Sequence, residues 1–116
     1  MEPIYDQSGA VVAWLKGTDI YHFNGSHAAV LWNHHVYGHR GQHLGLFHNG
    51  LFRDHQGGAV AFTRGTQDGP TKPIPELPPL PPIPAIPPTP ASPGIPPIPA
   101  TPSLGWGMAW QDFIRW

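Results

Sequence analysis

Short apolar runs alternate with turn-forming residues along the first 66 positions, with a turn signal about every eight residues. Asn24-Gly25 and Asn49-Gly50 are the strongest of these signals, because the type I′ turns of tight hairpins need positive φ. The other turn signals are Ser8-Gly9, Lys16-Gly17, Asn33-His34, Arg40-Gly41, Gly57-Gly58 and Arg64-Gly65. The pattern predicts eight strands of roughly four to five residues joined by tight turns.

The predicted strands group into four units, because several features recur every sixteen residues. Glycine recurs at Gly9, Gly25, Gly41 and Gly57, and a small residue follows four positions later at Ala13, Ala29, Gly45 and Ala61. A hydrophobic pair opens each unit at Ile4-Tyr5, Ile20-Tyr21, Val36-Tyr37 and Leu51-Phe52, with the last pair one residue early. A bulky pair closes each unit at Trp14-Leu15, Val30-Leu31, Leu46-Phe47 and Phe62-Thr63. A fixed period of this kind indicates repeated structural units.

One sixteen-residue hairpin cannot bury its own apolar face, so the four units must share a core. We therefore expect an all-β module over residues 1–66, in which four β-hairpins close around a pseudo-fourfold axis. A linear β-solenoid and an open meander also fit the spacing. The predicted core has small residues at its crowded centre, with bulkier ones around them: Ala13, Ala29, Gly45 and Ala61, then Trp14, Val30, Leu46 and Phe62.

A proline-rich tail follows a linker over residues 67–72. Proline occupies every third position from Pro75 to Pro102, ten times in register, and Ile or Leu precedes most of these prolines. Polyproline II has three residues per turn and a rise of roughly 3.1 Å, so this register places the prolines on one edge and the aliphatic residues on another. Residues 73–102 are thus predicted to form a straight polyproline II rod about 90 Å long with an apolar edge.

The last segment, residues 103–116, contains an aromatic stripe. Trp106, Trp110 and Phe113 have the i, i+4, i+7 spacing of one helix face, and Trp116 follows. A short helix from Met108 to Trp116 would carry them, whereas Gly105 and Gly107 disfavour helix further upstream. Two interpretations stay open: a clasp that anchors the tail on its own module, and an interface helix for another chain.

Composition excludes several classes of function. The chain of 116 residues has a formal charge of −1 and no basic block, which disfavours nucleic-acid binding. It has no cysteine, no apolar run long enough to span a membrane and no signal-peptide pattern at its start. Cytoplasmic location is therefore the default expectation, and export without a signal stays open.

Eight histidines are an unusual number for this length. His39 and His43 flank the predicted turn at Arg40-Gly41 and are weak candidates for a zinc or nickel pair. No carboxylate or cysteine is patterned with them, so we expect solvent-facing histidines and neither a metal nor a cofactor. Carboxylates are scattered, and no serine or threonine stands in a recognisable catalytic grouping. We therefore do not expect an enzyme.

Five segments together carry a resemblance to a known family: EPIYDQSGAVVAWL, HLGLFHNGLFRD, AVAFTRG, GPTKPIPELPPLPPIP and PSLGWGMAWQDF. With these segments the chain resembles the bacterial 4-fold beta flower proteins over nearly its whole length. The resemblance implies four β-hairpin petals around an axis, and it implies no activity, cofactor or catalytic residue. Gly105 and Gly107 depart from the family pattern, which tends to carry serine at these positions.

The preferred hypothesis is a structural or scaffolding protein that forms homo-oligomers, because a straight rod would leave its apolar edge exposed. The predicted interface comprises Ile74, Leu77, Leu80, Ile83, Ile86, Ile95, Ile98, Trp106, Trp110, Phe113 and Trp116. One alternative is a carbohydrate-binding module that uses Tyr5, Tyr21, Tyr37 and Phe52, one ring per petal. Another is a proline-rich ligand for a partner's groove, with Lys72 to Pro78 as its core.

Overall fold

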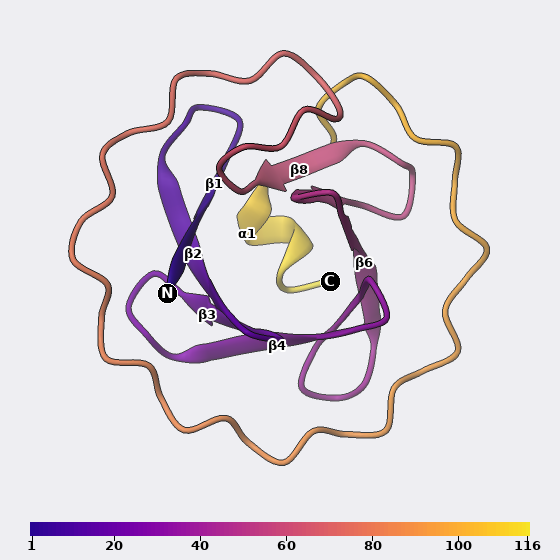
Figure 1. The fold of residues 1–116 in the computed structure, drawn as a ribbon. Helices are drawn as coiled ribbons and strands as arrows, with labels where there is room; N and C mark the ends of the chain where they lie inside the picture. Colours follow the sequence, from indigo (N-terminus) through magenta and orange to yellow (C-terminus); the bar gives the residue numbers. More distant parts are fainter.

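Eight antiparallel strands follow one another around a closed barrel in the computed structural model, which describes residues 1–116 (Figure 1). The strands are β1 (Glu2–Tyr5), β2 (Val11–Lys16), β3 (Asp19–His22), β4 (His27–Trp32), β5 (His35–Tyr37), β6 (His43–His48), β7 (Leu51–Arg53) and β8 (Ala59–Phe62). Pairing of Tyr5 with Phe62 closes the barrel between β1 and β8. The predicted all-β fold of four hairpins is confirmed, and closure excludes the solenoid and the open meander.

Two kinds of turn alternate around the barrel. Two-residue turns join β2 to β3, β4 to β5 and β6 to β7, with positive φ at Gly17, Asn33, His34, Asn49 and Gly50. Longer turns at residues 6–10, 22–26, 38–42 and 54–58, here called the outer turns, place Gly9, Gly25, Gly41 and Gly57 at φ between 79° and 95°. In each outer turn the glycine N–H donates to the carbonyl three residues earlier. All eight predicted turn signals lie at turns of the structure.

The four units keep a strict sixteen-residue register, so the predicted one-residue shift in the fourth unit is wrong. A β-bulge follows the first residue of the opening pair in every unit, at Ile4/Tyr5, Ile20/Tyr21, Val36/Tyr37 and Phe52/Arg53. The equivalent pair in the fourth unit is therefore Phe52-Arg53 instead of Leu51-Phe52. A search for hydrophobic pairs misses it because arginine replaces the tyrosine.

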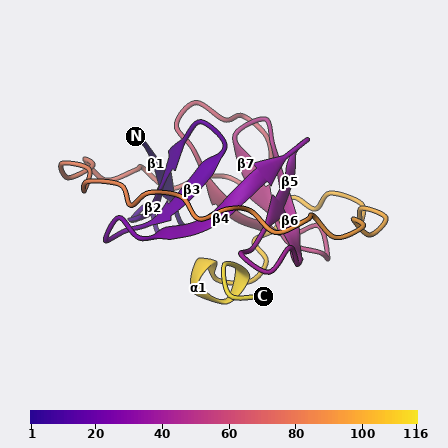
Figure 2. The same cartoon turned by 90° about the horizontal axis from the view of Figure 1, so that it is seen from below.

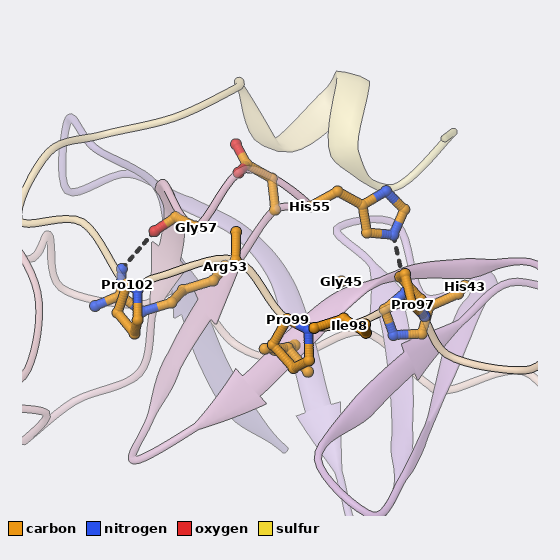
Figure 3. A pocket seen from close by; sticks show the side chains of 12 residues that line it. His43, Gly45, Arg53, His55, Gly57, Pro97, Ile98, Pro99 and Pro102 are labelled. Carbon is orange, nitrogen blue, oxygen red and sulfur yellow. Dashed lines mark hydrogen bonds between the residues drawn. The ribbon is translucent and has the colours of Figure 1, made fainter.

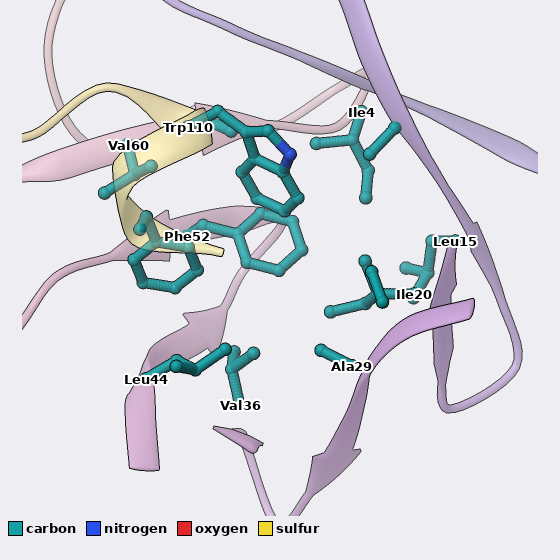
Figure 4. Close-up of a cluster of buried hydrophobic side chains, with 13 residues drawn as sticks. Ile4, Leu15, Ile20, Ala29, Val36, Leu44, Phe52, Val60 and Trp110 are labelled. Carbon is teal, nitrogen blue, oxygen red and sulfur yellow. The ribbon is translucent and has the colours of Figure 1, made fainter. Parts of the chain in front are cut away.

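The barrel interior holds most of the apolar core (Figure 4). The small residues Ala13, Ala29 and Ala61 are 0% exposed and Gly45 is buried. Trp14 and Phe62 instead join a second buried cluster with the rings of Tyr5 and Tyr21, because successive side chains of a strand point to opposite faces. Val30 and Leu46 are only half-buried.

The single helix, α1 (Trp110–Phe113), lies at one end of the barrel (Figure 2). Trp110 and Phe113 insert their rings toward Phe52, at centroid distances of 5.2 and 6.3 Å. Phe113 is 0% exposed, and a Cβ atom added to Gly45 would lie 2.6 Å from its ring. The helix is shorter than the predicted helix from Met108 to Trp116. A membrane-spanning helix, which needs a long apolar stretch, does not occur in the structure.

The proline-rich tail encircles the barrel (Figure 1). The prediction of a straight rod about 90 Å long is wrong, because the whole molecule measures 37 × 36 × 20 Å. Residues 71–103 form neither helix nor strand. The tail and barrel together make a flat disc, with the tail as its edge.

Candidate functional site

The encircling segment, residues 73–103 and here called the collar, is held by the four outer turns. Its backbone N–H groups at Glu76, Ala85, Gly94 and Ser103 donate to the carbonyl oxygens of Gly9, Gly25, Gly41 and Gly57, at 2.9, 2.9, 2.8 and 3.0 Å. The donors are nine residues apart and the acceptors sixteen apart. Three proline triplets therefore span one petal, and the collar repeats with the pseudo-fourfold symmetry of the barrel.

Glycine is needed at the outer turns for space as well as for positive φ. A Cβ atom on Gly9 would lie 2.6 Å from the carbonyl oxygen of Ile74, and one on Gly25 would lie 2.7 Å from that of Ile83. Gly41 and Gly57 face the carbonyls of Ser92 and Thr101 even more closely. The collar thus passes directly over each glycine.

The proline pattern contains the nine-residue period. A second proline follows the proline of the triplet at Pro79, Pro82, Pro88 and Pro97. The four residues whose N–H groups donate to the outer turns also follow a triplet proline, and none of them is proline. Proline has no N–H, so it cannot occupy a donor position. The three-residue period alone does not reveal the nine-residue period. The signal is the positions at which the second proline of a triplet is absent.

Three side chains add to the attachment of the collar. The Glu76 carboxylate accepts from the backbone N–H of Val11. The Tyr37 hydroxyl donates to the carbonyl of Gly94 at 3.1 Å, and the Arg53 guanidinium donates to that of Ser103 at 2.7 Å. Tyr37 and Arg53 are sixteen residues apart and their acceptors nine apart, so the two side chains perform the same task in adjacent petals.

The outward edge of the collar together with Leu104, here called the rim, is aliphatic and largely exposed. Exposure is 93% for Ile74, 90% for Leu77, 93% for Leu80, 93% for Ile83, 92% for Ile86, 96% for Ile95, 95% for Ile98 and 80% for Leu104. Four of these, Leu77, Ile86, Ile95 and Leu104, are nine residues apart, so each petal carries one at an equivalent position. No charged residue or histidine occurs from residue 77 to 111. Ile74 to Ile98 of the predicted interface thus face solvent, whereas Trp110 and Phe113 pack inside their own chain.

Two histidine chains lie between adjacent strands and the outer turns. In the first, His27 Nε2 is 2.9 Å from Asp19 Oδ1, and His27 Nδ1 is 2.8 Å from His39 Nε2. In the second, His43 Nε2 is 2.9 Å from His35 Nδ1, and His43 Nδ1 is 2.8 Å from His55 Nε2. Their members are sixteen residues apart, so the chains are equivalent, with His35 in place of Asp19.

Each histidine chain lines a small cavity between barrel and collar. The cavity beside His43 and His55 measures about 130 Å³ and has Arg53 and residues Pro97–Ala100 in its wall (Figure 3). The equivalent cavity beside His27 and His39 measures about 110 Å³, with residues 88–90 opposite. The collar face of both is formed by uncharged residues.

Burial, followed by the proximity of His55 and then His35, lowers the pKa of His43 to about 4. Burial, with His39 and His27 nearby, also lowers the pKa of His22. Both shifts favour neutral imidazoles around neutral pH.

The candidate metal pair is not brought together, since His39 and His43 belong to different histidine chains. Both ring nitrogens of His27 and of His43 already take part in hydrogen bonds. No group of three or more histidine or carboxylate side chains is arranged to hold a metal ion.

The residues proposed for carbohydrate binding and for a proline-rich ligand do not form exposed binding surfaces of those kinds. Tyr5, Tyr21, Tyr37 and Phe52 are at most 2% exposed, so they form no solvent-facing row. The Lys72 ammonium donates to the carbonyls of Asp68 and Pro70 in the linker. Ser8 and Ser26 donate to Asp6 and Asn24 within their own turns.

Comparison with known proteins gives one finding about relationship. Searches of the curated proteins and of the solved structures found no match. A sequence model described as 4-fold beta flower protein matches residues 2–114, nearly the whole chain. Four hairpins closed around a common core agree with that description. The chain belongs to the 4-fold beta flower protein family.

Proposed function

We propose that this chain is a non-catalytic structural module that assembles side by side with further copies of itself through the rim. The observation that carries the proposal is the near-complete exposure of the rim aliphatics, seven of them at 90% or more. Burying one Ile or Leu contributes roughly 1.5–3 kcal/mol. Exposed apolar surface of this extent is typical of interaction sites.

The shape of the rim favours several neighbours for each disc over a simple dimer. A contribution of roughly 1.5–3 kcal/mol per side chain, divided by roughly 25 cal/mol per Å², corresponds to an apolar surface on the order of 100 Å² for each rim side chain. Two discs touching edge to edge meet over a small part of the rim, so each would bury only a few of its eight rim side chains. That is far below the roughly 800 Å² per partner of a stable pairwise interface. The equivalent positions Leu77, Ile86, Ile95 and Leu104 offer one similar contact per petal, which suits an array of copies.

The lack of catalytic machinery supports the non-catalytic part of the proposal. The histidine chains themselves have little room for a substrate, because the two cavities that they line measure about 130 and 110 Å³, below the ~150 Å³ of a cavity that holds a benzene-sized molecule. The larger hollows, of about 510 to 680 Å³, lie elsewhere on the molecule. No serine or threonine hydroxyl is hydrogen-bonded to a histidine.

The test is the mass of the full chain in solution, measured over a range of concentrations. Replacing Leu77, Ile86, Ile95 and Leu104 by Ser keeps every proline and every collar donor. We expect wild-type assemblies to dissociate to monomers in this variant while the thermal unfolding midpoint stays unchanged.

The matched control is Phe23→Ser, which removes an aromatic side chain that is 50% exposed in a hollow lined by β2, an outer turn and α1 but by no collar residue. It should assemble like the wild type. A monomeric wild type at high concentration, or a quadruple rim variant of unchanged mass, would overturn the proposal.

A further inference from the structure

The two histidine chains share a geometry and differ in the group at one end, which is a carboxylate in the first and an imidazole in the second. In each, a central histidine on a strand contacts a histidine of the next outer turn and a residue of the preceding strand. That last residue is Asp19 in the first chain and His35 in the second. A carboxylate can only accept a hydrogen bond, whereas an imidazole can donate or accept.

The chain that contains Asp19 tolerates an added proton. Because Asp19 accepts, His27 must donate through Nε2, and its Nδ1 then accepts from Nε2 of His39. His39 donates from Nε2 in this arrangement whether it is neutral or protonated. A proton added to its other nitrogen leaves both hydrogen bonds intact, and the carboxylate balances its charge. His22 is a further titratable group near His39 and His27, and its pKa is lowered by burial and then by these two histidines. Gly38 stands at the position equivalent to His22 beside the second chain.

The chain of three histidines accommodates only one added proton. Neutral His43 has one N–H and one lone pair, so one neighbour must accept and the other must donate. A first added proton can reside on the donating end or on His43 itself. A second would place two N–H groups against each other across 2.8 or 2.9 Å.

The charged groups near His43 do not offset a second positive charge, because Arg53 and Asp54 carry opposite charges in the same cavity. Arg53 and Asp54 line the same cavity, and the Tyr37 ring meets His43 edge-on at 5.4 Å. Arg53 adds a positive charge. The Asp54 carboxylate already accepts from the backbone N–H groups of Gln56, Gly58 and Met108. The Trp116 ring against His55 and the collar wall of the cavity are uncharged.

Acid therefore favours opening of the second chain. Unfolded histidine takes up a proton around pH 6.5, and the pKa of His43 in the folded chain is lowered to about 4. The folded form binds fewer protons between these values. The stability contributed by neutral His43 is thus present above about pH 6.5 and is lost as pH falls towards 4.

The outer turn 54–58 is the element that would move away from the barrel, because it carries His55. This turn also holds the end of the collar, through the bond from Ser103 to the Gly57 carbonyl. Through Asp54 it holds the backbone N–H of Met108, which leads into α1. The equivalent turn 38–42 carries His39 and holds Gly94 of the collar.

We propose that the His35–His43–His55 chain is an acid-sensitive latch, which below about pH 6 loosens the 54–58 turn and frees the end of the collar together with the segment that leads into α1. The Asp19–His27–His39 chain keeps the neighbouring turn closed under the same conditions. This latch is independent of the assembly proposed above, since it acts within one chain.

Amide hydrogen exchange on the full chain at pH 7 and pH 5 tests the latch, with rates corrected for the intrinsic pH dependence of exchange. Protection of the Ser103 and Met108 amides should fall at least tenfold more than protection of the Glu76 and Gly94 amides. An equal loss at all four amides, or no loss at Ser103 and Met108, would overturn the proposal.

Two variants exchange the chemistry of the histidine chains. His35→Asp gives the second chain the donors and acceptors of the first, so Ser103 should keep its protection at pH 5. Asp19→His is the reciprocal change and should make Gly94 acid-sensitive. His55→Gln, which cannot take up a proton, should also abolish the acid response at Ser103 and serves if His35→Asp does not fold. Variants at His35 or His55 that lose protection like the wild type would contradict the latch.

Discussion

Barrel and collar obtain their shapes in different ways. The barrel has a continuous antiparallel ladder and a core whose members are at most 9% exposed. The collar has no ladder, is attached by four backbone hydrogen bonds and a few side chains, and leaves its Ile and Leu side chains at least 90% exposed. The barrel is therefore stabilised by its own burial, whereas four turns of the barrel impose the curvature of the collar. Substitutions in the barrel core should therefore lower the free energy of unfolding more than substitutions in the collar, whose effects should stay near the turn concerned.

The largest effect should come from the barrel core at α1. Phe113→Ala removes a fully buried ring that packs on Phe52 and against Gly45. Truncation of a buried phenylalanine typically costs 3–5 kcal/mol. We expect a loss of about that size in the free energy of unfolding by urea, and a change below about 0.5 kcal/mol for the exposed control Arg115→Ala. A loss below about 1 kcal/mol for Phe113→Ala would mean that α1 is not part of the core.

A glycine substitution can separate the contribution of the collar from that of the turn itself. Gly41 and Gly17 both have positive φ, but the collar carbonyl of Ser92 lies against Gly41 and nothing lies within 4 Å of the Cβ position of Gly17. Alanine should cost roughly 1–2 kcal/mol at either site because of the left-handed backbone. We expect Gly41→Ala to cost more than Gly17→Ala by about 1 kcal/mol or more, since the collar must also move away.

Equal losses in thermal or urea unfolding for Gly41→Ala and Gly17→Ala would indicate that the collar contributes nothing at that turn. Exchange of the Gly94 amide provides a local readout, because its acceptor is the carbonyl of Gly41. That amide should lose protection in Gly41→Ala and keep it in Gly17→Ala.

The barrel could be predicted from the sequence because its signals are local. Glycine, asparagine and the sixteen-residue period identify the turns, and the strands lie between them. The small residues Ala13, Ala29 and Ala61 were placed in the core for the same reason. The fourth opening pair was misplaced because Arg53 stands where the other units have tyrosine, although it holds the collar as Tyr37 does.

The collar and the histidine chains depend on contacts between distant residues. A three-residue period describes the local backbone, and nothing in it reveals that Gly9 will meet Glu76. The histidine pairs were missed because His27 and His39, like His43 and His55, are twelve residues apart and meet across a turn. The sixteen-residue repetition of both pairs was the available signal.

A proline scan tests the nine-residue register of the collar with a smaller effect. Ala85→Pro removes the N–H that donates to Gly25, whereas Ala91 makes no backbone hydrogen bond to the barrel. Because Pro-Pro already occurs at equivalent steps of the triplet, both substitutions suit the local pattern. Ala85→Pro should cost about 1 kcal/mol, the usual net value of one hydrogen bond.

The control Ala91→Pro should leave unfolding unchanged or raise stability slightly, because it stiffens the unfolded chain. If both proline variants have the same unfolding midpoint, the register described by the four collar donors does not stabilise the protein.

The smallest effect, a shift of zero, is expected when metal is removed. The histidines meet as hydrogen-bonded pairs with nitrogens 2.8–2.9 Å apart, and no three ligands converge. Two imidazole ligands bound to one tetrahedral zinc at about 2.0–2.1 Å would have to separate to roughly 3.3 Å. A chelator should therefore leave the thermal midpoint of the full chain unchanged at neutral pH, and added Zn²⁺ should not raise it. Because a structural metal contributes folding energy directly, a drop of several degrees with chelator would show that the histidine chains hold a metal instead of shared protons.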